Sequence, residues 1–82
     1  MEILVERRLH VTLVAIAGSV DGATAPVLVA SLREQVAGGF VRIVADFSRV
    51  DYTSSAGLRA LLETVKETRQ RGGDLRLAAV HR

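Results

Sequence analysis

Three consecutive hydroxyl residues, Thr53, Ser54 and Ser55, precede a stretch in which apolar residues recur with helical spacing. One serine or threonine is enough to cap a helix, because its side chain accepts a hydrogen bond from a free backbone N–H. A helix amino terminus also carries a partial positive charge, which would stabilise a phosphate attached there. The triplet therefore has two interpretations, a phosphorylatable serine or plain capping, and the residues alone leave both open.

Acidic residues accompany these hydroxyls. Asp21 follows one expected strand, Asp46 is expected to end another, and Asp51 lies just before the triplet. Ligands and partners tend to meet the carboxyl ends of parallel strands, so we expect Asp21 and Asp46 to converge with Ser54 and Ser55. Carboxylates would oppose a phosphate that the helix favours, which suits a reversible switch. The same residues are also ordinary turn and loop formers.

Other chemistries have weaker support. A Ser-His-Asp triad would need His10 or His81 beside Ser55, but His10 is expected at the wrong end of a strand and His81 at the limit of the chain. The pairs Gly38-Gly39 and Gly72-Gly73 end helices and do not belong to a phosphate-binding motif. Two histidines without cysteine make a poor metal set, and aspartates near loops more often bind water than Mg²⁺. We therefore expect no enzyme, no cofactor and no metal.

Hydrophobic periodicity predicts the elements that position these residues. Expected strands cover residues 3–5, 10–17, 42–47 and 75–80, and the second and third read as buried on both faces. Thr24 is the expected cap of a first helix that has Pro26 near its start, and the triplet begins a second helix. The expected core side of the first helix is Val27, Leu28, Ala30, Leu32 and Val36, and that of the second is Leu58, Leu61, Leu62 and Val65.

The order strand-strand-helix-strand-helix-strand also predicts how the elements assemble. Helical connections between strands favour parallel pairing and right-handed crossovers. We therefore expect one α/β domain over residues 1–82, a mixed and mostly parallel sheet with helices packed on it. On the water-facing side of the second helix, Glu67 and Arg71 are expected to pair one turn apart.

Composition narrows the class of partner. The formal net charge is +2 with both signs interspersed, and only 4% of residues are aromatic, so no basic stripe or stacking platform for nucleic acid is expected. The chain has no cysteine, no apolar run long enough for a bilayer, and no basic leader in its first residues. These features lead us to expect a cytoplasmic protein.

The stretches "GSVDGATAP" and "VADFSRVDYTSSAGLRALLETVKETRQRGGDLRLAAV" resemble the STAS domain, and more narrowly the bacterial anti-sigma factor antagonists. The resemblance covers nearly the whole chain in the same order. It implies that the protein binds an anti-sigma factor serine kinase, which frees a sigma factor for transcription. It also implies that the kinase phosphorylates a residue at the start of the second helix, that the complex then dissociates, and that a PP2C-type phosphatase reverses the modification.

The resemblance assigns site residues with one departure. The family turn usually reads Asp-Ser-Ser/Thr-Gly-Leu, and alignment on Gly57-Leu58 puts Ala56 directly before the glycine, with Ser55 and then Ser54 preceding it. Ser55 is then the preferred acceptor and Ser54 the second. The implied partner-binding or flanking residues are Asp21, Asp46, Thr53, Ala56, Gly57 and Leu58.

A second departure is length. Family members usually continue with a last helix that covers the sheet, and this chain stops at Arg82. Two explanations stay open: a last helix was lost or cut off, or another surface covers the sheet. We expect the sheet face left bare to bind a second copy or another partner, because large apolar patches are seldom left in water. Because Ala56 lacks a hydroxyl, an alternative function stays open: an unphosphorylated STAS scaffold or ligand-sensing subunit, for example of a transport complex.

Overall fold

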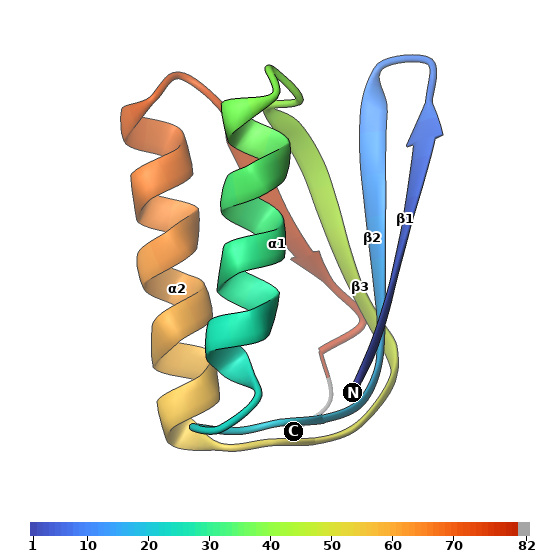
Figure 1. Cartoon of the computed structure of the whole chain (residues 1–82), viewed down its shortest axis with the longest axis vertical. Coiled ribbons are helices and arrows are strands. Elements are labelled where there is room, and N and C mark those ends of the chain that lie inside the picture. Colours follow the sequence, from blue (N-terminus) through green and yellow to red (C-terminus); the bar gives the residue numbers. More distant parts are fainter. Residues whose placement is uncertain (81–82) are drawn as a thin grey trace.

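The fold is a four-stranded sheet with two helices, seen in a computed structural model that describes residues 1–80 (Figure 1). Residue His81, considered above for catalysis, lies outside the described residues. In chain order the elements are β1 Glu2–Arg8, β2 Val11–Val20, α1 Ala25–Ala37, β3 Arg42–Thr53, α2 Ser55–Gln70 and β4 Asp74–Ala78. Neither helix of the described residues has the length and apolarity that a membrane crossing requires.

The strands lie in the order β1-β2-β3-β4, with β1 antiparallel to β2 and the other pairs parallel. Each helix connects two neighbouring parallel strands, and both helices pack on the same face of the sheet (Figure 1). This confirms the predicted α/β class and the mixed, mostly parallel sheet. Residues 71–80 contain no further helix, so the opposite face of the sheet, here called the open face, has no helical layer.

The core lies between the sheet and the two helices. Residues of the central strands β2 and β3 that point to the helices, such as Val14 and Ala45, are almost fully buried, whereas open-face residues of β2, such as Leu13 and Ala15, are only half-buried. The prediction that these strands are buried on both faces was therefore wrong, because only one face is covered. The buried cluster comprises Val14, Ile16, Val20, Ala25, Leu28, Leu32, Ile43, Ala45, Phe47, Val50, Leu61 and Leu75.

The helices face the core with stripes that differ from those predicted. Val27 and Leu62 are 60% and 53% exposed, and Ala30 is exposed as well. The buried residues are Ala25, Leu28, Val29 and Leu32 in α1, and Gly57, Leu61, Thr64 and Thr68 in α2. The buried side of α2 therefore differs from the predicted one: it includes Thr64 and Thr68, and Leu62 lies on the outer side of the helix.

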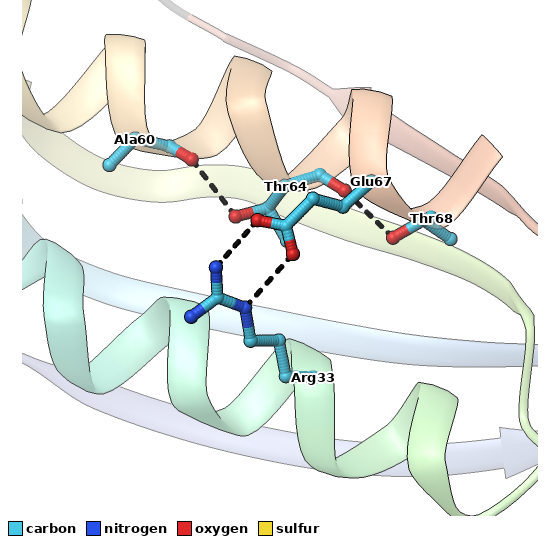
Figure 2. Close-up of polar contacts among 5 residues, drawn as sticks. All are labelled: Arg33, Ala60, Thr64, Glu67 and Thr68. Carbon is cyan, nitrogen blue, oxygen red and sulfur yellow. Dashed lines mark hydrogen bonds and ion pairs between the residues drawn. The ribbon is translucent and has the colours of Figure 1, made fainter. Parts of the chain in front are cut away.

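The buried threonines satisfy their own hydroxyl groups. Thr64 donates to the carbonyl oxygen of Ala60 at 2.9 Å, and Thr68 donates to that of Thr64 at 2.8 Å (Figure 2). This bonding to the preceding turn lets a polar residue occupy a core position. Nearby, Arg33 of α1 donates two hydrogen bonds to Glu67, so the predicted pairing of Glu67 with Arg71 is replaced by one between the helices (Figure 2). The hydrogen bond from Arg33 also lowers the pKa of Glu67.

Strand β3 is longer than predicted and continues to Thr53. Asp46 pairs with Ala15, but Arg49 pairs with Ala17, so β3 contains one more residue than β2 over this stretch, and a second irregularity follows. Such bulges let a strand continue while its direction changes. The prediction that a strand ends at Asp46 was wrong, and the true end lies beside the hydroxyl triplet.

Candidate functional site

The carboxyl ends of β2 and β3 meet the amino terminus of α2. The backbone N–H of Ser54 donates to the carbonyl oxygen of Val20, the last residue of β2, at 2.9 Å. A Cβ atom on Gly57 would lie 2.8 Å from that oxygen, closer than side-chain carbons approach a backbone oxygen. Glycine at position 57 therefore allows the first turn of α2 to sit directly on the end of β2.

The hydroxyl residues of the triplet have different environments. Thr53 is the half-buried last residue of β3. Ser54 is the N-cap of α2, and its Oγ accepts a hydrogen bond from the Gly57 N–H at 3.0 Å. Ser55 is the first helical residue, it is exposed, and no other residue of the described chain hydrogen-bonds its hydroxyl. Capping therefore accounts for Ser54 but leaves Ser55 unexplained.

Asp21 organises the loop that faces this helix start. Its carboxylate accepts hydrogen bonds from the backbone N–H groups of Ala23 and Thr24, at 2.9 and 3.0 Å. The bond from Thr24, followed by that from Ala23, lowers the pKa of Asp21. Thr24 stands at the predicted N-cap position of α1, but its hydroxyl donates to the Ser19 carbonyl oxygen and does not cap the helix. The next residue, Gly22, lies near the Ala56 side chain, which places this loop against α2.

The other two acidic residues lie in different places. Asp51 is near the end of β3 and accepts a hydrogen bond from the Ser19 hydroxyl at 3.1 Å. Asp46 lies on the open face, and its carboxylate accepts from the backbone N–H of Ser48 at 2.9 Å. Its partner Ala15 is five residues before the end of β2, about 16 Å along the strand. The structure therefore brings Asp21 to the helix start and leaves Asp46 away from it.

The outer side of α2 carries a shallow hollow that begins at Ser55. Its volume is about 430 Å³, and it is lined by Ser55, Leu58, Arg59, Leu62, Glu63 and Lys66. These residues share one side of the helix because they are three, four, seven, eight and eleven positions from Ser55. Leu62 is 53% exposed in the middle, with charged side chains of both signs around it. The lining of the hollow thus combines apolar and charged side chains and includes Ser55, whose hydroxyl is not hydrogen-bonded to the described residues.

Comparison with known proteins identifies the family to which this chain belongs. The sequence pattern of the STAS domain matches residues 2–82. The chain belongs to the STAS domain family. This chain is 48% identical over 58 residues to a Bordetella bronchiseptica protein named "Putative anti-sigma factor antagonist BtrV". The matched stretch covers 71% of this chain and 50% of that protein. The domain thus spans about half the length of this curated relative.

Solved structures share the fold of the STAS domain. An anti-sigma factor antagonist from Mycobacterium paratuberculosis has 30% identity and a TM-score of 0.79, with 93% of this chain and 64% of that chain covered. The anti-sigma factor antagonist SpoIIAA in its unphosphorylated form has 17% identity and a TM-score of 0.78, with 99% and 76% covered. The phosphorylated form of SpoIIAA, a Bacillus cell fate determinant, gives a TM-score of 0.70 at 17% identity, with 90% and 68% covered. The resemblance to this family that the motifs indicated is confirmed.

Two features of the site were missed from the sequence. Leu62 was assigned to the core, so the hollow beside Ser55 was not foreseen. The signal that could have revealed it is the threonine pair Thr64 and Thr68, which together with Leu61 gives an alternative helical stripe. The tight contact at Gly57 was also missed, although a glycine in the first turn of a helix usually has a packing reason.

Proposed function

We propose that this STAS domain is an anti-sigma factor antagonist that binds an anti-sigma factor serine kinase through the start of α2 and is released by phosphorylation of Ser55. The observation that carries the proposal is that only one of the two serines, Ser54, uses its hydroxyl to cap the helix. Ser54 Oγ is occupied by the Gly57 N–H, whereas Ser55 is exposed with a free hydroxyl. A kinase can therefore reach Ser55 without breaking the helix cap.

The hollow on α2 supplies a docking surface next to that serine. Leu62 offers an exposed apolar contact, and Arg59, Glu63 and Lys66 surround it with charge. Interfaces of this kind gain affinity from a few apolar anchors and specificity from the charges around them. A kinase docked over the hollow would have Ser55 at the edge of the interface.

A phosphate on Ser55 acts differently in the free and the bound protein. In the free domain it lies at the positive end of α2, where free backbone N–H groups and the helix dipole stabilise a dianion. In the complex it would be desolvated beside Leu58 and Leu62, which disfavours the bound state. Phosphorylation therefore leaves the fold intact and lowers affinity for the kinase. A PP2C-type phosphatase that removes the phosphate would restore binding.

The relatives support the same direction. BtrV and the Mycobacterium paratuberculosis protein are both named as anti-sigma factor antagonists, and SpoIIAA has been solved with and without its phosphate. For this chain, the kinase, the phosphatase and a cytoplasmic location are parts of the proposal.

One observation favours a different function. Ala56, directly before Gly57, lies against the loop at Gly22 and has no hydroxyl to modify. If the acceptor position of this family is the residue before the glycine, the domain is an unphosphorylated scaffold or ligand-sensing subunit, for example of a transport complex.

Phosphate mapping separates these functions. We incubate three proteins with ATP and the serine kinases of the organism that makes this chain: wild type, Ser55→Ala and Ser54→Ala. The phosphate is then located by peptide mass spectrometry. We expect one phosphate on wild type and on Ser54→Ala, and none on Ser55→Ala. Equal phosphorylation of Ser55→Ala would contradict the assignment of the acceptor. No phosphate on any variant would favour the scaffold function.

A further inference from the structure

Strand β1 (Glu2–Arg8) forms an edge of the sheet. It pairs with β2 on one side, and its other side has no partner within residues 1–80 (Figure 1). An edge strand presents a row of free N–H and C=O groups, which is a template for another strand. Two apolar side chains in its middle are also accessible to solvent, because Leu4 is 59% and Val5 is 36% exposed.

We propose that β1 binds a second copy of the chain by antiparallel pairing with the same strand, about a two-fold axis that passes at Val5. The pairing would join two four-stranded sheets into one sheet of eight strands. At each end of the joint, Glu2 of one copy faces Arg8 of the other. At the centre, Val5 faces Val5, and Leu4 faces Glu6 on either side.

The charge pattern of β1 selects this register over its neighbours. A two-fold axis perpendicular to the sheet keeps the two open faces on the same side, so each position faces one with the same side-chain direction. If the axis passed at Leu4, Glu2 would face Glu6 twice, and if it passed at Glu6, that glutamate would face itself. The axis at Val5 aligns the whole strand and puts no like charges opposite each other, whereas like charges directly opposite are destabilising.

The remaining side chains of β1 are compatible with this pairing. Arg8 lies on the open face with Glu6, and their ion pair of 3.1 Å holds the guanidinium on the side where Glu2 of the second copy would lie. Arg7 points to the helix side, where it donates to Gln35 at 2.9 Å and covers the Phe40 ring at 3.3 Å from its centre. Its charge is therefore directed inward, toward α1, and does not repel the second copy.

Charge reversal and rescue test the pairing. The dimer dissociation constant of the full chain is measured by analytical ultracentrifugation for wild type, Glu2→Arg, Arg8→Glu and the double variant. Each single reversal replaces two attractive contacts with two repulsive ones, so we expect a dissociation constant at least about tenfold higher. The double variant restores opposite charges and should return to within about threefold of wild type. Arg69→Glu, an exposed charge reversal on α2 outside both β1 and the hollow, is the matched control and should leave the constant unchanged.

A cysteine cross-link tests the register independently. The chain has no cysteine, so Val5→Cys introduces a single thiol at the proposed axis. Oxidation should link two copies of Val5→Cys into a covalent dimer. Leu9→Cys, at the 97% exposed tip of the β1–β2 hairpin, controls for random collision; its two thiols would lie at opposite ends of the joint, so it should form no covalent dimer.

Three results would overturn the proposal. The first is a wild type that stays monomeric at millimolar concentration. The second is a double variant whose dissociation constant remains as high as those of the single reversals. The third is a Val5→Cys protein that cross-links no better than Leu9→Cys. A dimer with the last property would use another surface, such as the open face of the sheet.

Discussion

The two serines at the start of α2 should respond very differently to alanine. In Ser54→Ala, the Gly57 N–H loses the oxygen that lies 3.0 Å away, and Gly57 is buried, so water cannot easily replace it. Loss of an N-cap side chain costs about 0.5 to 2 kcal/mol, and the burial of this N–H places the expected value in the upper half of that range. Ser55 has an exposed hydroxyl without a protein partner among the described residues, so Ser55→Ala should change stability by less than about 0.5 kcal/mol.

Thermal unfolding followed by circular dichroism measures both effects. For a domain of this size, 1 kcal/mol shifts Tm by about 4 to 8 °C. We therefore expect Ser54→Ala to lower Tm by about 5 to 16 °C, and Ser55→Ala to shift it by at most about 4 °C. Ser54→Asp is a useful control, because aspartate also caps helices and should keep most of the stability. An equal loss in both alanine variants, or a larger loss in Ser55→Ala, would refute the assignment of cap and free hydroxyl.

Three further predictions concern the same helix and its surroundings. Gly57→Ala puts a Cβ atom 2.8 Å from a strand carbonyl oxygen, so urea denaturation should show a loss of about 1 to 3 kcal/mol, and an unchanged midpoint would contradict the tight contact. Leu61→Asp buries an unpaired carboxylate and should unfold the chain, whereas Leu62→Asp should fold normally and lose affinity for the kinase. If the circular dichroism spectra of these two variants were equal, the burial assignment would be refuted. Hydrogen bonds lower the pKa values of Asp21 and Glu67 below their usual 3.8 and 4.5, so their stabilisation is complete above about pH 5 and is lost as pH falls through the lowered values. Stability measured from pH 7 to pH 3 should therefore fall less in Glu67→Gln than in wild type, and parallel curves would count against the contribution of this pair.

The sequence predicted the order and type of the elements because hydrophobic periodicity and glycine pairs mark them locally. It did not predict which side of each helix is buried. Leu62 and Val27 are apolar residues that lie outside the core, while Thr64 and Thr68 are polar residues inside it. That choice depends on where α1 and α2 sit over the sheet, and on threonine hydroxyls that bond within their own helix.

The site was predicted in part for a similar reason. The capping signal of Ser54 and the turn signal of Asp21 act over three or four residues, and the sequence shows both. The position of Asp46 depends on two irregularities in the pairing of β2 with β3, which lengthen β3 beyond the expected end. No local pattern around Asp46 distinguishes a strand end from a strand that continues through a bulge.

The most direct test of the proposed switch is paired affinity capture from the native cell, with wild type and Ser55→Asp as baits and Ser54→Asp as the control for added charge. The negative charge of Ser55→Asp lies at a helix amino terminus, where the fold tolerates it. We predict that wild type retains an ATP-dependent serine kinase, that Ser54→Asp retains it with reduced yield at most, and that Ser55→Asp loses it. Retention of the same kinase by Ser55→Asp at the wild-type level would contradict the proposal that this residue controls binding.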